Sequence, residues 1–402
     1  MKLAVFDDFP VKFYPVSLTR STGDIRCGIL KLRQRLQALL FGDEEIVILD
    51  ESLIPLYRER HSDWLLNSTA GDTLFANSRI IINPEIIAKI RNLKLNQGII
   101  DQAGSLVALR VEYTNTNADY PSFQAMAAKA EMEKVGKALY QNMADIIADN
   151  SRLIEFDFEQ FFQEAENFME TEPGVTILNP YKAWIGEDAV LSPGVVIDAT
   201  HGPVVIDEKA QIMSHAVITG PAYIGKNTVI KIGAKIYGGT SIGPVCKVGG
   251  EIEGSIIQAY SNKQHDGFLG HAYLGEWVNI GAGTSNSDLK NNYKPVAFHS
   301  YAENAKILSG YQFLGSILGD HTKTGINCTL NTGVVVGAGC NLWGRDMISD
   351  HIPSFSWGEA CSLTPYNFEA FSETARMVKL RRKLVFTETE EALYSKLWHR
   401  EH

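Results

Sequence analysis

The sequence predicts an α/β domain followed by a left-handed parallel β-helix of hexapeptide repeats and a short C-terminal helical tail. Three observations support this fold class. Aliphatic residues recur at steps of six in the second half, strands alternate with amphipathic stretches in the first half, and 402 residues exceed one ordinary core. A step of six is the repeat of a triangular β-coil, in which each side turns one aliphatic residue inward.

The N-terminal half has the pattern of an α/β layer structure. Lys2 to Phe6, Glu45 to Leu49 and Ser105 to Val111 are predicted as short buried strands. Leu30 to Leu40 is amphipathic, and Gln124 to Ile147 is predicted as one long helix. Strands alternating with helices indicate a largely parallel sheet.

The β-helix is predicted from its repeats, because several coils must stack before a core forms. One stretch keeps the step of six without a break, through Leu318, Thr324, Leu330, Val336 and Leu342. Further aliphatic residues that precede a glycine are assigned to the same inward set: Ile185, Ile224, Ile232, Ile242, Val248, Leu269, Leu274 and Ile280.

Turn signals divide the chain into three parts. The cluster Glu172-Pro173-Gly174 follows an acidic stretch, so we expect domains at residues 1–175 and 176–357 and a helical extension at 358–402. Thr387 and Glu390 form a capping-box pattern that opens a C-terminal helix. The basic run 379–383 before it is either a solvated helix face or a phosphate site.

Composition excludes several classes of protein. A net charge of −10 argues against a nucleic-acid partner, and no apolar stretch is long enough to span a membrane. Carboxylates near the N-terminus argue against a signal peptide. Five cysteines without close pairs favour a reducing cytoplasm over a disulfide frame or a zinc site.

Two groups of motifs together carry a resemblance. The first is the opening Phe6-Asp7-Asp8 with the segments 14–20 and 24–30, and the second is the run from His265 to Thr284, which ends in Asn-Ile-Gly-Ala-Gly-Thr. With them the chain resembles the family of sugar nucleotidyltransferases similar to the bifunctional N-acetylglucosamine-1-phosphate uridyltransferase/glucosamine-1-phosphate acetyltransferase. The resemblance implies a nucleotidyltransferase-like N-terminal domain, an acyltransferase-like β-helix and a cytoplasmic homotrimer. It also implies NTP, a sugar 1-phosphate and Mg²⁺ as reactants and cofactor, and acetyl-CoA as a possible co-substrate.

The resemblance places His265 on the catalytic histidine of the acetyltransferase, as general base on the attacking amine or hydroxyl. Two positions depart from the family. Phe268 replaces a tyrosine that contacts the sugar phosphate, and Glu253 replaces a phosphate-binding lysine. The resemblance assigns the acyl-site substrate contacts to Phe268, Asn279, Ala282 and Lys294.

Other interpretations of these residues stay open. His265 could be a solvated or structurally bonded side chain, and His271 is a nearby competitor for the role of base. Asn279 could belong to an inward-stacked asparagine ladder instead of orienting a substrate.

At the nucleotide end the family's Gly-rich phosphate loop is absent. The segment 18–28 stands in its place, and Arg20, Asp24 and Arg26 are its candidates for nucleotide and phosphate binding. Alternatively, Arg20 pairs with Asp24 to hold a turn. Arg33 and Arg35 are expected on an exposed helix face.

The metal ligand at this end stays unidentified. Asn77 occupies the position of the family's metal-binding aspartate and is assigned to nucleotide binding, since a neutral amide is a poor Mg²⁺ ligand. Asp72 is close in sequence but precedes the strand.

Three functions follow from these observations. The first is nucleotidyl transfer from an NTP to a sugar 1-phosphate. The second is acyl transfer from acetyl-CoA with His265 as base, and the third is a non-catalytic nucleotide-binding trimeric scaffold. The sequence does not identify the sugar, the nucleotide or the acyl acceptor.

Overall fold

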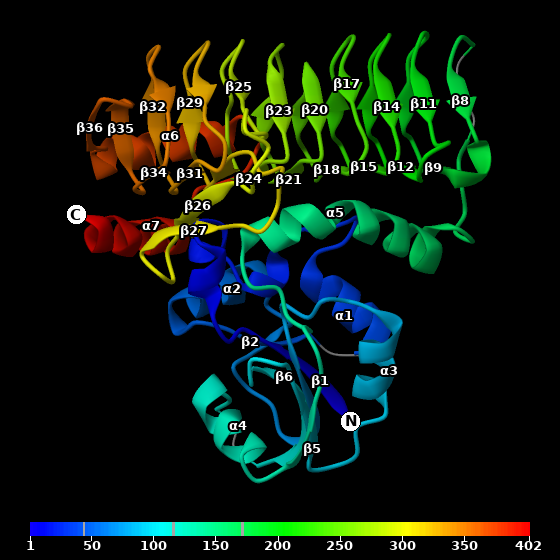
Figure 1. Cartoon of the computed structure of the whole chain (residues 1–402), viewed down its shortest axis with the longest axis vertical. Coiled ribbons are helices and arrows are strands. Elements are labelled where there is room, and N and C mark those ends of the chain that lie inside the picture. The colour runs from blue at the N-terminus through cyan, green and yellow to red at the C-terminus, as the bar shows by residue number, and fades with distance from the viewer. Residues whose placement is uncertain (43–44, 115–116, 170–172) are drawn as a thin grey trace.

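The computed structural model describes residues 1–42, 45–114, 117–169 and 173–402. An α/β domain lies beneath a long β-helix, and two C-terminal α-helices pack at the C-terminal end of the β-helix (Figure 1). Glu172, the first residue of the predicted boundary cluster, lies outside the described residues. In the described ranges no helix is long and apolar enough to cross a bilayer.

The N-terminal domain is built on a seven-stranded sheet of order β3-β2-β1-β4-β6-β5-β7. Adjacent strands pair in parallel from β3 through β2 and β1 to β4, whereas β6 runs antiparallel to both β4 and β5. The carboxyl ends of β1, β2 and β4 therefore share one edge of the sheet. The strands are β1 (Lys2–Phe6), β2 (Ile46–Ile48), β3 (Leu65–Leu66), β4 (Gly71–Asn77), β5 (Gln97–Ile100), β6 (Leu106–Tyr113) and β7 (Glu131–Lys134).

The predicted helix from Gln124 to Ile147 is wrong. The chain instead forms β7 between two helices, because pairing with β5 overrides local helix propensity there. The side chain of Asn142 accepts from two backbone N–H groups and so starts a new helix. The helices of this domain are α1 (Leu32–Leu40), α2 (Ile54–Arg60), α3 (Pro84–Arg91), α4 (Tyr120–Ala127) and α5 (Met143–Asp157).

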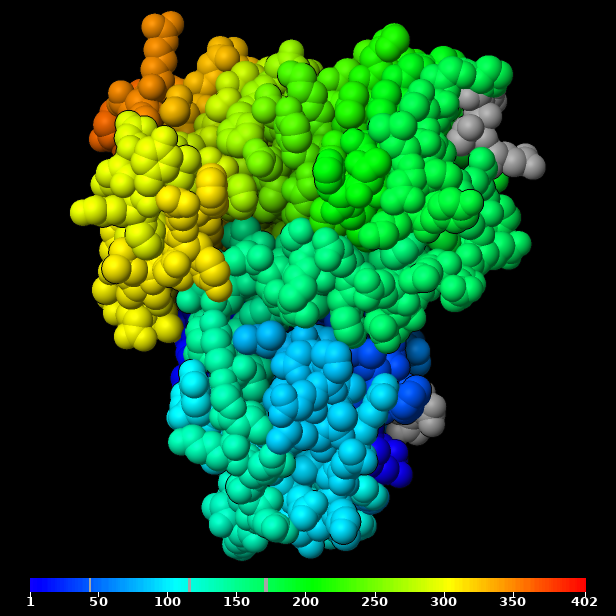
Figure 2. Space-filling model, turned by 45° about the vertical axis from the view of Figure 1, so that its right-hand side comes forward, coloured from blue at the N-terminus to red at the C-terminus, as the bar shows by residue number. Residues whose placement is uncertain are grey.

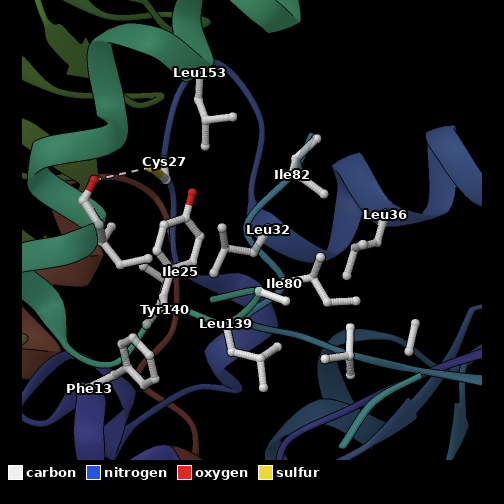
Figure 3. Packing of buried hydrophobic residues seen from close by; sticks show 14 of the residues in the cluster. Phe13, Ile25, Cys27, Leu32, Leu36, Ile80, Ile82, Leu139, Tyr140 and Leu153 are labelled. Atoms are coloured by element: carbon white, nitrogen blue, oxygen red, sulfur yellow. Dashed lines mark hydrogen bonds between the residues drawn. The ribbon is translucent and has the colours of Figure 1, made fainter. Parts of the chain in front are cut away.

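A buried apolar cluster joins the sheet to α1 and α5. Leu32 and Leu36 of α1 meet Ile80 and Leu153 in it (Figure 3). The Cys27 thiol lies in the same cluster and donates to the carbonyl oxygen of Ile146 at 3.2 Å.

Arg33 and Arg35 do not lie on an exposed helix face, so that expectation is wrong. Arg35 is fully buried and forms a bidentate ion pair with Asp157 of α5, with its Nε 2.6 Å from the carboxylate. A buried pair of this kind fixes one helix against another, since removing either partner leaves a buried charge unpaired.

The second half forms a parallel β-helix with three walls, which confirms the predicted fold class. Leu318, Thr324, Leu330, Val336 and Leu342 all point into its core and are at least 95% buried. Ile232 is an exception, since it is 66% exposed. The inward residue of that coil side is Ile230, at the step of six from Ile224.

The first wall faces the N-terminal domain, and α5 lies along it beside β15 and β18 (Figure 1). Its strands are β9 (Ala183–Ile185), β12 (Val204–Ile206), β15 (Ala222–Ile224), β18 (Thr240–Ile242), β21 (Ile256–Ala259), β24 (Tyr273–Glu276), β28 (Ile317–Leu318), β31 (Val335–Val336) and β34 (His351–Ile352).

The second wall continues through a single bridging residue, Asn279. Its strands are β10 (Val190–Leu191), β13 (Gln211–Ile212), β16 (Val229–Ile230), β19 (Lys247–Val248), β22 (Asn262–Lys263), β29 (Lys323–Thr324), β32 (Asn341–Trp343), β35 (Ser356–Glu359) and β36 (Ser362–Pro365).

The third wall closes each coil. Between β23 and β25 the Asn286 side chain accepts from the Gly270 N–H and donates to the Gly270 carbonyl, in place of a backbone pair. The strands of the third wall are β8 (Thr176–Leu178), β11 (Val196–Asp198), β14 (Val217–Thr219), β17 (Lys235–Ile236), β20 (Glu251–Glu253), β23 (Phe268–Gly270), β25 (Ser285–Asn286), β30 (Thr329–Leu330) and β33 (Met347–Ile348).

An insertion at residues 287–314 leaves the β-helix and reaches the N-terminal domain. It carries the hairpin of β26 (Ala297–Ser300) and β27 (Ala305–Leu308), and it bulges from one side of the molecule (Figure 2). The Tyr311 hydroxyl donates to Asp145 at 2.8 Å. This contact ties the insertion to α5.

Two helices end the chain, α6 (Phe368–Leu380) and α7 (Glu388–Glu401). The predicted capping box of Thr387 and Glu390 is confirmed at the start of α7. Arg60 of α2 pairs with Glu390 at 2.6 Å, so α7 bridges the tail to the N-terminal domain.

Candidate functional site

A cavity of about 250 Å³ opens at the carboxyl ends of β1 and β2, and we call it the strand-edge cavity. In an open α/β sheet, ligands bind at this edge where the strand order reverses, as it does between β1 and β4. The lining is strongly acidic. Its carboxylates are Asp7, Asp8, Asp50, Glu51 and Asp119.

Asp7 follows the last residue of β1. Its carboxylate accepts from the Ser78 hydroxyl at 2.6 Å and from the Thr22 N–H at 3.0 Å. Burial raises the pKa of Asp7 from 3.8 to about 6, and these two hydrogen bonds oppose the rise. Asp7 is thus a carboxylate that carries no ion-pair partner among the described residues and sits at the ligand-binding edge.

Asp8 is held differently. Arg79 donates to it through Nε at 2.7 Å and through Nη2 at 2.6 Å, and both side chains are 1% exposed. Arg79 also donates to the carbonyl oxygen of Tyr140. This bidentate pair fixes the turn after β1 against the end of β4.

Asn77 does not line the strand-edge cavity. It is fully buried, its amide donates to the Leu106 carbonyl at 2.9 Å, and its oxygen accepts from the Arg79 N–H. The sequence analysis did not single out Asp7 as a site residue. A carboxylate directly after the first buried strand is the signal that could have found it.

Arg20 does not line this cavity either. It is buried between the domains, where it forms an ion pair with Asp320 of the β-helix and another, 3.1 Å long, with Glu276. Burial alone would raise the pKa of Glu276, but the charges of Arg20 and Arg60 lower it below its usual range. The guanidinium that was expected to bind phosphate is thus engaged by protein carboxylates.

Asp24 holds the loop after β1, but not through Arg20. It pairs with Lys31 at 3.0 Å and with Arg33 at 3.1 Å, and it accepts from the Tyr57 hydroxyl at 2.6 Å. Arg20, Asp24 and Lys31 line a small interdomain cavity of about 30 Å³, which is separate from the strand-edge cavity.

Arg26 docks on the β-helix. Its backbone N–H donates to the side chain of Gln258 at 2.9 Å, and its guanidinium lies over the ring of Tyr223 and donates to the Ile29 carbonyl. The segment that was assigned to phosphate binding therefore joins the two domains in this structure.

A second cavity, of about 430 Å³, lies on the β-helix and brings His265 and Ala282 together with Lys231. We call it the coil cavity. His265 is exposed there. An exposed imidazole in a cavity of this size can accept a proton from a bound substrate.

The other predicted acyl-site residues lie outside the coil cavity. Phe268 is half-buried on β23, and Lys294 is exposed on the insertion. Asn279 lies on the outer surface of the second wall, where its oxygen accepts from Asn262, so it is not part of an inward asparagine ladder.

The other candidate base, His271, has a ring that contacts two side chains. Its Nδ1 lies 2.7 Å from Asp288, and its ring stacks on Phe313 with centroids 4.9 Å apart. Both partners belong to the insertion. A carboxylate at Nδ1 fixes the orientation of an imidazole and leaves Nε2 for another partner.

Comparison with known proteins agrees with this two-part architecture. Residues 3–166 match a family described as sugar nucleotidyl transferase. The match falls within the N-terminal domain. The resemblance predicted from the sequence is thereby confirmed, and the chain joins a sugar nucleotidyltransferase domain to an acyltransferase-like β-helix.

The chain is similar to the bifunctional protein GlmU of Streptococcus equi subsp. zooepidemicus, with 26% identity over 365 residues that cover 80% of this chain and 74% of that protein. A bifunctional sugar-1-phosphate nucleotidylyltransferase/acetyltransferase of Sulfurisphaera tokodaii is 35% identical over 158 residues, which are 35% of each chain. Among solved structures, the Arabidopsis UDP-N-acetylglucosamine acyltransferase covers 53% of this chain and 78% of its own, with 14% identity and a TM-score of 0.33.

Proposed function

We propose that the N-terminal domain transfers a nucleotidyl group from an NTP to a sugar 1-phosphate and releases pyrophosphate. The observation that carries the proposal is Asp7, a carboxylate without an ion-pair partner among the described residues, in a cavity at the switch point of a nucleotidyltransferase sheet. An oxygen of the sugar phosphate attacks the α-phosphorus, and the bond to pyrophosphate breaks.

The donor set of the strand-edge cavity fits Mg²⁺. Five carboxylates line it, and Mg²⁺ prefers oxygen ligands, often one or two carboxylates completed by substrate phosphates. We assign Asp7 to hold the ion, because Arg79 already neutralises Asp8. When bound, the ion would offset the negative charge of the phosphates, which these carboxylates would otherwise repel.

A pyrophosphate-release assay with a panel of NTPs and hexose 1-phosphates, with and without Mg²⁺, tests the proposal. Turnover that depends on Mg²⁺ supports it. Nucleotide binding without turnover, seen as a raised melting temperature, would favour the scaffold function instead.

A second proposed activity is acyl transfer from acetyl-CoA in the coil cavity. It is supported by His265, which is exposed beside Ala282 in a cavity of about 430 Å³. Loss of a general base costs ~10²–10⁴ in rate. His265→Ala should lower the release of free CoA by that factor, whereas His201→Ala, an exposed histidine elsewhere on the coils, should not.

We also propose that three chains assemble through their β-helices in the cytoplasm, where NTPs and acetyl-CoA are made. The prism shape of the helix permits a ring-closing interface. Light scattering at the elution peak should give three times the mass of one chain. A mass of one chain would exclude the trimer.

A further inference from the structure

A third cavity lies on the outer surface of the β-helix, where the C-terminal end of α6 crosses the second wall. Its volume is about 250 Å³, and we call it the basic pocket. It is separate from the strand-edge cavity, which lies in the other domain. Four cations and two aromatic rings line it: Lys247, Lys323, Arg381, Arg382, Tyr260 and Trp277.

Two of the four cations of this pocket donate to neutral oxygen atoms. Lys323 donates to the carbonyl oxygen of His321 at 2.8 Å, and Arg382 donates to the side-chain oxygen of Asn262 at 2.9 Å. In the described part of the chain none of the four cations forms an ion pair with a carboxylate.

The surroundings of the two lysines lower the pKa of each. Burial lowers the pKa of Lys323 to about 8. Burial, and then the charge of Arg382, lowers the pKa of Lys247. A bound anion would relieve both effects, because it would favour the charged form of each lysine.

The basic run 379–383 is divided by the fold. Lys379 turns inward and pairs with Glu390 of α7, and Lys383 is exposed. Arg381 and Arg382 line the pocket. The solvated interpretation fits Lys383, and Arg381 and Arg382 are the residues left for the phosphate-site interpretation.

The aromatic rings add a flat surface beside the charges. Tyr260 and Trp277 stack with centroids 4.5 Å apart and an angle of 11° between their planes. Tyr260 is half-buried, so its ring is available from the pocket, and a nucleobase can stack on such a ring.

We propose that the basic pocket binds a nucleoside that carries two or more phosphates. The phosphates lie among the four cations and the base lies on Tyr260. Two sources have this chemistry, a free nucleotide and the nucleotide end of coenzyme A. Gln264 lines both this pocket and the coil cavity, so the two cavities adjoin.

Calorimetric titration of the full chain with ADP, coenzyme A and pantetheine tests the proposal. EDTA is present throughout, so that binding in the acidic strand-edge cavity, which needs Mg²⁺ under the proposed function, is suppressed. The variants are Arg381→Gln and Lys247→Gln, and the matched control is Lys383→Gln in the same basic run.

We expect ADP and coenzyme A to bind, and each pocket variant to weaken that binding about tenfold or more, while the control binds as the wild type does. Coenzyme A that binds much more tightly than ADP would identify the cofactor as the source, and ADP that binds more tightly than coenzyme A would identify a free nucleotide. Pantetheine alone should not bind. No binding of ADP or coenzyme A, or binding that both pocket variants leave unchanged, would overturn the proposal without affecting the nucleotidyl-transfer proposal.

Discussion

Arg20 in the loop after β1 forms a buried ion pair with Asp320 of the β-helix, across 300 residues of sequence. Thr19 donates to the same carboxylate at 2.6 Å, and Glu276 binds the other side of the guanidinium at 3.1 Å. The loop that the resemblance assigns to nucleotide binding is thus anchored to the neighbouring domain.

Replacement of Arg20 by alanine should destabilise the protein. It leaves the buried Asp320 without its cation and Glu276 with only the charge of Arg60, at a cost of about 3–5 kcal/mol in the free energy of unfolding. Urea denaturation measures this. Arg110→Ala, which breaks a more exposed pair with Asp72, should cost about 0–1 kcal/mol. Unchanged stability of Arg20→Ala with loss of nucleotide binding would favour a phosphate-binding role for Arg20.

Asp7 should make the protein less stable as the pH rises. Its pKa is about 6 in the folded state and 3.8 in the unfolded state, so the folded state holds the extra proton between these values. Stability therefore falls as the pH rises from about 4 to 6. Asp7→Asn should be more stable than the wild type at pH 7, by up to about 3 kcal/mol, and the difference should vanish near pH 4.

Melting temperatures of Asp7→Asn and wild type across this pH range test the prediction. An asparagine variant that is less stable than the wild type at pH 7 would mean that burial of the charged Asp7 carboxylate does not destabilise the folded state.

The inward positions of the β-helix should dominate its stability. Leu330 is 1% exposed in the coil core, so Leu330→Ala should cost about 2–5 kcal/mol. Leu308, which is 71% exposed on the hairpin, provides the control, and its replacement by alanine should change stability by less than about 0.5 kcal/mol. Equal effects of the two changes would contradict the assigned register.

The two candidate bases of the acyl site can be separated by their partners. If His265 is the base, Asp288→Asn should leave the release of free CoA within a few-fold of the wild type, because Asp288 contacts His271 alone of the two. If His271→Ala and Asp288→Asn each lowered the rate of free CoA release by ~10² or more while His265→Ala stayed active, His271 would be the base.

The β-helix could be predicted because its signal is local and repeated. The step of six from Ile224 leads to Ile230 and Ile236, which are buried, so the period was a better guide than the Ile-Gly pair at Ile232. The N-terminal domain was harder, since β7 forms only by pairing with β5. No local pattern could show this.

The candidate site was predicted in part. His265 and Ala282 do meet in one cavity, because they lie on successive coils whose backbones pair there, with the Gly283 N–H donating to the Asp266 carbonyl. The partners of Arg20 and Arg26 lie in the other domain, more than 200 residues away, so they could not be predicted from the sequence of the loop. Asp7 could have been found, since it directly follows the first buried strand.

The most direct test of the nucleotidyl-transfer proposal is pyrophosphate release by Asp7→Asn beside Asp72→Asn. Both changes remove one carboxylate charge from the same sheet, but Asp72 lies at the opposite end of β4, paired with Arg110. With Mg²⁺, an NTP and the accepted sugar 1-phosphate, we predict a loss of at least ~10²-fold for Asp7→Asn and wild-type turnover for Asp72→Asn. Turnover by folded Asp7→Asn at the wild-type rate would contradict the placement of the reaction in the strand-edge cavity.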